Sequence, residues 1–226
     1  GIDLFEQMPI GQILFFLGIA GAIIGSVYAI KATDLNRMVA YSSAAQIGYI
    51  FMSLGIGGTA GYAAAIFHLI GHSLTKSLLF LVTPRLQEVS GGSLRFKDLM
   101  GSAQRDRVSG FLFLFASLSM VGFPALAGFS SKLLITEAAF DSGNTATLIL
   151  VVLTLAVSTV LNALYFIRTV LRIYARTPGK KDRPVRGMHT PGYLIPAFVL
   201  VGLNLFLGLL PTITSGLIWQ GFSMLP

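Results

Sequence analysis

The stretch YAAAIFHLIGHSLTKSLLFLVT, residues 62 to 83, decides the fold class of this chain. A helix needs roughly 20 predominantly apolar residues to cross the hydrocarbon core of a membrane, and this stretch has that length with one formal charge, Lys76. The strands of a membrane β-barrel would instead alternate apolar and polar residues in short segments. The stretch therefore predicts a transmembrane helix in an all-α membrane protein.

The rest of the chain has the same character. Hydrophobic residues make up 54% of the sequence and charged residues 11%, and the mean hydropathy is +0.77, outside the range of soluble globular domains. Region 108 to 141 is too long for one crossing and is interrupted by GFPALAG at 122 to 128, so we expect two helices there, the second short. We predict a polytopic helix bundle of about seven transmembrane helices, including one discontinuous region, in a single transmembrane domain over residues 1 to 226. The remaining predicted spans are 10 to 30, 38 to 56, 144 to 170 and 192 to 213.

The net charge of +7 comes from basic residues in three predicted loops, 31 to 37, 84 to 107 and 172 to 186. Such a distribution indicates membrane topology rather than binding of nucleic acid. Because we expect region 108 to 141 to cross the membrane twice, we place the last basic loop opposite the other two, and charge alone then gives no orientation.

Three titratable side chains, His68, His72 and Lys76, lie four residues apart in the stretch from 62 to 83. This spacing puts them on one helical face, about 6 Å apart. A charge inside a membrane is costly and is by default a sign of function, and histidine exchanges protons at neutral pH, so the row is predicted to pass protons. In a second interpretation, the histidines bond to neighbouring backbone or serines while Lys76 reaches the membrane surface. Metal binding by the two histidines is a third, disfavoured by the charge of Lys76.

The second candidate site is GFPALAGFSSKLL, residues 122 to 134, in which Pro124 and the glycines interrupt a helix. Freed backbone at membrane depth is tolerated where it lines a cavity or is packed in protein, and transporters build ion sites from such discontinuous helices. We therefore expect Lys132, just past the break, to belong to an ion site. The alternative is a loop lysine at the membrane surface.

The chain is expected to carry no cofactor. It contains no cysteine and so supplies no iron–sulfur ligand and no disulfide. Haem is disfavoured because His68 and His72 share one helical face and His189 falls in a polar loop. No catalytic residue for covalent chemistry and no metal site are predicted. Quinone binding, an electron-transfer-associated role and a purely structural scaffold remain alternatives to proton conduction.

Four motifs stand out by their order and spacing: TDLNRMVAYSSAAQIGYIFMSLG (33 to 55), IFHLIGHSLTKSLLFL (66 to 81), LSMVGFPALAGFSSKLLI (118 to 135) and LNALYFIR (161 to 168). Together they resemble one known family, the antiporter-like subunits of respiratory complex I, membrane-bound hydrogenases and Mrp-type cation/proton antiporters. That resemblance implies two inverted repeats, each with half of a proton path around a broken helix, and it implies proton-path roles for Lys132, Lys76, His68 and His72. Further accessory positions are expected at Glu137, Tyr41, Ser42 and Arg37.

By this resemblance the chain holds only the second repeat, about 38 to 174, flanked by helices at about 10 to 30 and 192 to 213. The chain starts at Gly1 rather than Met, and we expect a fragment or a fold split between two chains. Asn36 stands where the family commonly has a lysine. The implied function is proton translocation in a redox-driven or Mrp-type complex.

The implied partners are other membrane subunits, one of which supplies the first repeat, together with the lipid bilayer and protons, with sodium as the alternative ion and no nucleic acid. The glycines at 18, 21 and 25 are expected to offer a close packing face. The implied location is a bacterial or archaeal cytoplasmic membrane.

Overall fold

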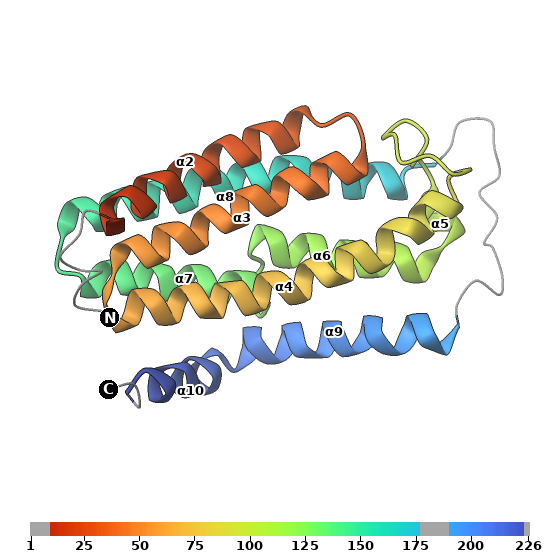
Figure 1. Ribbon diagram of the computed structural model, residues 1–226. Helices are drawn as coiled ribbons and strands as arrows, with labels where there is room; N and C mark the ends of the chain where they lie inside the picture. The colour runs from red at the N-terminus through yellow and green to blue at the C-terminus, as the bar shows by residue number, and fades with distance from the viewer. Residues whose placement is uncertain (1–9, 177–189, 224–226) are drawn as a thin grey trace.

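The computed structural model describes residues 10 to 176 and 190 to 223, and within these ranges the chain is a bundle of long helices (Figure 1). His189 and most of the third basic loop lie outside the described residues. The helices are α2 (Ile10–Lys31), α3 (Leu35–Ile56), α4 (Gly58–Glu88), α5 (Ser102–Arg105), α6 (Arg107–Val121), α7 (Ala127–Asp141), α8 (Thr145–Tyr174), α9 (Pro191–Leu209) and α10 (Pro211–Ser223).

Five of these helices are long and apolar enough to cross a membrane, namely α2, α3, α4, α8 and α9. They match the five continuous spans predicted from the sequence. The main difference lies at the C-terminal end, where the span expected at 192 to 213 stops at Leu209 and α10 begins at Pro211. Asp34 caps α3 by accepting a hydrogen bond from the backbone N–H of Arg37 at 3.0 Å.

The discontinuous region consists of α6 and α7, which follow one another end to end beside α4 (Figure 1). α6 stops at Gly122, which has φ 95° and suits a residue without a side chain. The expectation that this region crosses the membrane twice is wrong. Each half has 15 residues and is about 22 Å long, so neither half spans a core of about 30 Å. The two halves share one crossing.

A single crossing brings the basic segments to one end of the bundle, including the start of the third loop at Arg176. Two hydrogen bonds tie these segments together there: the Leu35 amide donates to the Leu94 carbonyl at 3.0 Å, and the Gln104 side chain donates to the Tyr174 carbonyl at 2.8 Å. Within the described residues, every Lys and Arg except Lys76 and Lys132 lies at this end. We call it the basic end.

Glycines hold α2 and α3 in close contact. A Cβ added at Gly18 would lie 2.2 Å from the Met52 amide nitrogen, and one at Gly25 would lie 2.5 Å from that of Ala45. Gly48 on α3 is equally tight against Ala22, at 2.4 Å. The small-residue face of α2 is therefore buried within this chain, where it excludes any side chain larger than hydrogen.

Candidate ion-translocation site

Lys76 lies inside the bundle on α4. Its side chain is 5% exposed, and its ammonium donates to the backbone carbonyl of Val39 at 2.5 Å and to the Ser42 hydroxyl at 2.6 Å, both on α3. These neutral oxygens are its hydrogen-bond partners in the structure, and no carboxylate of the described residues pairs with it. The interpretation in which Lys76 reaches the membrane surface is therefore wrong.

The two histidines follow on the same face of α4. Their rings are parallel, with centroids 6.2 Å apart. His68 is 2% exposed, and its Nδ1 shares a hydrogen bond of 2.9 Å with the Ser131 hydroxyl on α7. The other nitrogen of His68, Nε2, and the Nδ1 of His72 are buried without a protein partner. These two nitrogens are available to bind water, which typically satisfies buried polar atoms of this kind.

Lys132 lies at the break between α6 and α7. Its ammonium donates to the carbonyl of Val121, the last residue of α6, at 2.6 Å and to the Thr159 hydroxyl on α8 at 2.7 Å. A positive charge is favourable at this position because the C-terminal end of a helix carries partial negative charge. Lys132 therefore adds a charged cap at the C-terminal end of α6, beside the backbone cap in which the Gly122 N–H donates to the carbonyls of Leu118 and Ser119.

Tyr49 on α3 connects the histidine row to the broken helix. Its ring meets that of His68 edge to face, with centroids 5.3 Å apart, and the Lys132 ammonium lies 5.8 Å from the centre of the same ring. Its hydroxyl is hydrogen-bonded to Ser158. Lys132, Tyr49 and His68 thus form one contiguous cluster drawn from three helices.

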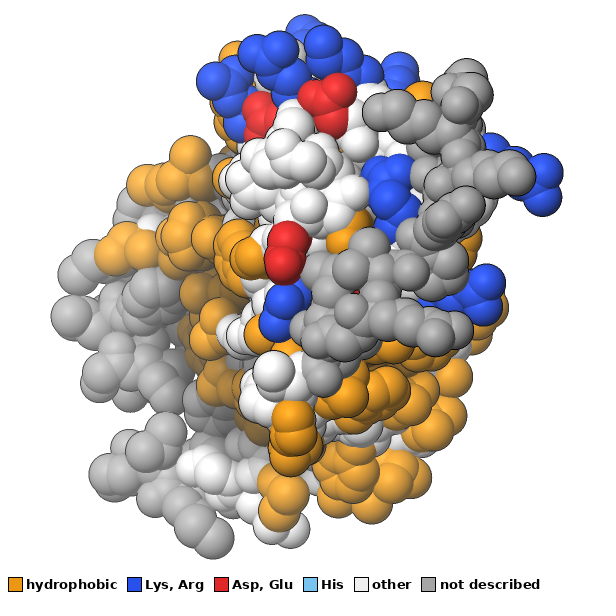
Figure 2. Space-filling view, turned by 90° about the vertical axis from the view of Figure 1, so that its right-hand side faces the viewer, with side chains coloured by type: hydrophobic (Ala, Val, Ile, Leu, Met, Phe, Trp, Pro, Cys, Tyr) orange, Lys and Arg blue, Asp and Glu red, His pale blue; other side chains and the backbone are white. Residues whose placement is uncertain are grey.

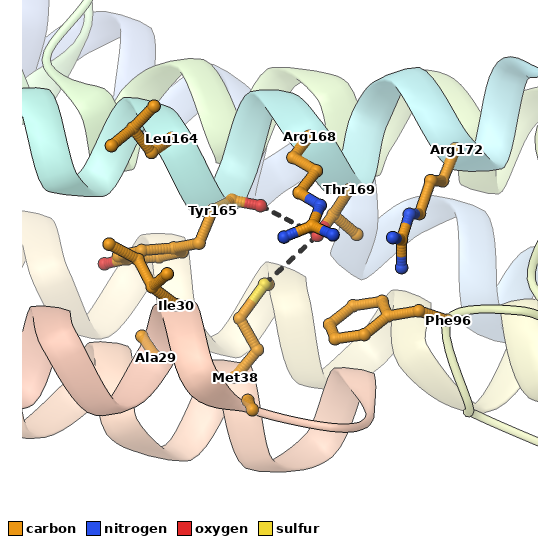
Figure 3. Close-up of a pocket in the computed structure, with 10 residues that line it drawn as sticks. Ala29, Ile30, Met38, Phe96, Leu164, Tyr165, Arg168, Thr169 and Arg172 are labelled. Carbon is orange, nitrogen blue, oxygen red and sulfur yellow. Dashed lines mark hydrogen bonds between the residues drawn. The ribbon is translucent and has the colours of Figure 1, made fainter.

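A second chain of hydrogen bonds runs from Tyr49 along α8 towards the basic end. The Asn162 amide donates to the Tyr49 hydroxyl at 3.3 Å, and the Tyr165 hydroxyl donates to Asn162 Oδ1 at 2.6 Å. Ser26 on α2 donates to the same oxygen at 3.2 Å. Tyr165 also lines a cavity of about 240 Å³ that lies between α2, α3 and α8 (Figure 3). The polar cluster therefore extends from the broken helix to a cavity near the basic end.

The break itself is held by α9. Asn204 accepts from the Ser119 hydroxyl of α6 at 3.1 Å and from the Ala127 amide at the start of α7 at 3.3 Å. Its own amide donates to Thr75 on α4 at 2.8 Å. One side chain thereby joins the two halves of the broken helix to the helix that carries the histidines.

The predicted site residues fall into two groups. Lys76, His68, His72, Lys132 and Ser42 come together inside the bundle. The other three accessory positions lie outside this cluster: Tyr41 is exposed and stacks on Tyr28, Arg37 is exposed and pairs with Asp34 at 3.4 Å, and Glu137 is exposed near the end of α7.

Sequence reasoning missed the contribution of α8 and α9. Thr159, Ser158 and Asn162 contact Lys132 or Tyr49, and Asn204 holds the break. Polar residues in otherwise apolar spans were the available signal, since such groups are costly in a membrane without a partner. Within the described ranges no three His, Asp or Glu side chains gather as a metal site would require.

The fold and the site define a class of protein: an integral membrane helix bundle with a discontinuous helix and a row of buried and half-buried lysine and histidine side chains. The family model described as NADH:quinone oxidoreductase/Mrp antiporter, transmembrane, matches residues 2–159. This chain belongs to that family.

Two bacterial relatives illustrate the sequence similarity. NADH-quinone oxidoreductase subunit N of Desulforudis audaxviator is 35% identical over 181 residues, which cover 78% of this chain and 35% of the relative. NADH-quinone oxidoreductase subunit N 2 of Solidesulfovibrio magneticus is 31% identical over 205 residues, which cover 91% of this chain and 42% of the relative. The chain thus spans well under half the length of these relatives.

Solved structures share the fold. A chain of the membrane-bound sulfane sulfur reductase, an archaeal respiratory membrane complex, matches with a TM-score of 0.80 at 24% identity over 94% of this chain and 42% of that one. A chain of the Mrp complex from Dietzia sp. matches with a TM-score of 0.76 at 23% identity over 92% of this chain and 46% of that one. The helix arrangement is accordingly shared with these two chains.

Proposed function

We propose that this chain forms a proton-conducting half of an antiporter-like subunit in a complex I-like, hydrogenase-like or Mrp-type membrane complex. One observation carries the proposal: two lysines inside the bundle, Lys76 buried and Lys132 half-buried, lie at the two ends of a row containing two stacked histidines, and neither pairs with a carboxylate of the described residues. A buried ammonium whose only partners are neutral oxygens is costly. A fold retains such groups where they serve function.

Each lysine is arranged to release its proton without losing its position. Each ammonium makes two hydrogen bonds to oxygen acceptors, and a neutral amine still carries two N–H donors, so both bonds can persist after the proton leaves. Loading and unloading Lys76 or Lys132 therefore needs no large rearrangement of its surroundings. The proton is passed between the two lysines by His68 and His72 through water bound at their unpartnered nitrogens.

The broken helix couples the protonation of Lys132 to the helix that carries the histidines. Since Lys132 caps α6, a change in its charge alters the electrostatic balance at the junction with α7. Asn204 hydrogen-bonds to both halves of this junction and to Thr75 on α4. A change in the charge of Lys132 is therefore transmitted to α4, the helix that carries His68, His72 and Lys76. Ion-pair changes in the rest of the antiporter fold, on the same chain or a second one, would shift the protonation of Lys132 in this mechanism.

The distribution of charge orients the chain in this proposal. Loops that hold the excess of Lys and Arg usually face the cytoplasm, so the basic end is placed on the cytoplasmic side of a bacterial or archaeal membrane. The half-channel corresponds to residues 38 to 174 of the expected repeat. The chain in this scheme works within a multisubunit complex, and the partner surface includes the other half of the fold.

The test is proton uptake by the parent complex reconstituted in vesicles, measured with a pH-sensitive dye and expressed per assembled complex. Lys76→Met should reduce uptake to background while the complex assembles, whereas Ser77→Ala, on the neighbouring exposed position of α4, should leave it unchanged. Uptake at the normal rate by Lys76→Met would show that the row does not carry protons. Repeating the measurement in sodium-free buffer distinguishes proton from sodium transport.

A further inference from the structure

The cavity at the basic end is bordered by two arginines on α8. Figure 3 shows Arg168 and Arg172 projecting from α8 beside the cavity, with Phe96 below the second of them. The guanidinium of Arg172 lies 5.3 Å from the centre of the Phe96 ring. Neither arginine forms an ion pair with a carboxylate of the described residues, and the residues lining the cavity include no Asp or Glu. Two positive charges therefore face a cavity without a negative partner from the same part of the chain.

A shallow, open apolar groove, lined only by residues of α8 and its C-cap Ala175, continues from this cavity along the outside of that helix. The groove shares Leu164, Arg168 and Arg172 with the cavity and extends over Val160 and Leu171. The side chains of Leu164, Val160 and Leu171 are all more than half exposed. A charged cavity and a long apolar groove thus form one continuous surface.

The arginines lie at the depth of lipid headgroups. α8 ends at Tyr174, so Arg172 and Arg168 are within about 9 Å of the helix end. Figure 2, which faces the basic end, shows Lys and Arg side chains gathered over it with few acidic ones. The cytoplasmic leaflet is rich in acidic lipids, and basic pockets between transmembrane helices on that side bind their headgroups.

We propose that this surface is a binding site for one acidic phospholipid, with its phosphate between Arg168 and Arg172 and an acyl chain along Leu164 and Val160. Arginine suits this role because its planar guanidinium donates two parallel hydrogen bonds to phosphate oxygens. The Thr169 hydroxyl donates to the Tyr165 carbonyl at 2.8 Å, and its oxygen lies 3.2 Å from the Met38 sulfur; these residues form the inner wall of the cavity. The preference for an acidic lipid rests on the cytoplasmic placement of the basic end under the proposed function, whereas the cavity and its two arginines do not depend on proton conduction.

The test uses the purified parent complex, stripped of loosely bound lipid in detergent and titrated with phosphatidylglycerol or phosphatidylcholine. Retained lipid is counted by mass spectrometry. The complex should retain phosphatidylglycerol in preference to phosphatidylcholine, and R168Q/R172Q should bind phosphatidylglycerol about 30-fold more weakly. The matched control K97Q/R107Q removes two exposed charges from the same end, outside the cavity lining, and should bind normally.

A second variant addresses the apolar part of the site. Leu164→Trp fills the groove while keeping both arginines, and it should also lower phosphatidylglycerol retention. If R168Q/R172Q and K97Q/R107Q lose phosphatidylglycerol to the same extent, the lipid is held by general charge attraction, and the proposal of a specific site is overturned. If R168Q/R172Q retains phosphatidylglycerol normally but loses a neighbouring subunit, the two arginines pair with a carboxylate of that subunit. This outcome would likewise overturn the proposal.

Discussion

Replacing Lys132 by methionine separates the function of its charge from its contribution to packing. Methionine has nearly the same length and apolar stem but cannot donate to the Val121 carbonyl or the Thr159 hydroxyl. Leaving a buried acceptor unpaired costs about 1 to 3 kcal/mol. Removing a charge from the membrane interior returns about 2.5 to 3.5 kcal/mol. Two acceptors lose their donor, at a combined cost of about 2 to 6 kcal/mol, so the two effects oppose each other. We expect stability to change by less than about 4 kcal/mol and the complex to assemble.

Proton flux through the assembled complex should nevertheless fall to background in Lys132→Met, because the group that binds the proton is gone. Lys132→Arg should fail as well, since arginine stays protonated. The assay is dye-monitored proton uptake in vesicles, divided by the amount of assembled complex. Thr159→Val is the matched control: it removes one partner of Lys132 but keeps the ammonium, and a cost of about 1 kcal/mol corresponds to a roughly fivefold slower rate at most.

The reasoning is refuted if Lys132→Met assembles and conducts protons within about twofold of the unmodified complex. Loss of assembly without loss of flux per complex would instead make Lys132 a structural cap of α6. Thr159→Val conducting less than Lys132→Met would also contradict the assignment, because the hydroxyl would then matter more than the charge.

Three further predictions concern the row, the break and the chain along α8. His68→Ala and His72→Ala should each lower proton flux, and the double variant should lower it more than the product of the two single effects, because a gap of two helical turns is about 11 Å. Gly128→Ala should abolish assembly, because the added Cβ would lie 1.8 Å from a backbone oxygen of α6. Gly202→Ala is the control, since a Cβ there meets no atom within 4 Å, and a thermal-unfolding assay should show it to be as stable as the unmodified complex. Tyr165→Phe removes the donor to Asn162 and should cost about 1 kcal/mol of stability while slowing uptake.

Each of these has a contrary outcome. Normal flux in the double histidine variant would make the histidines packing residues. A stable Gly128→Ala complex would mean that the junction of the broken helix is less closely packed than its geometry indicates. If Tyr165→Phe lowers stability but leaves proton flux unchanged, the chain of hydrogen bonds from Tyr49 through Asn162 to Tyr165 has only a structural role.

Sequence alone was enough to predict the membrane class and most helix positions. An apolar run must lie in lipid or protein whatever surrounds it, so spans such as 62 to 83 are recognisable from hydropathy. The break was predictable in the same way, since glycine and proline at 122 to 128 interrupt a helix by local sterics. The spacing of His68, His72 and Lys76 likewise follows from the helical repeat of a single segment.

Only the tertiary structure decided which groups meet across helices. Whether the two halves around the break cross once or twice depended on where each helix ends in the folded chain, and halves of 15 residues, lying end to end beside α4, are too short to cross separately. The partners of Lys132 lie eleven residues before it and twenty-seven after it, and the Asn204 that holds the break is more distant still. Hydropathy and helical spacing describe one segment at a time. Contacts between segments depend on the side chains of several helices at once, so they could not be derived from any one pattern.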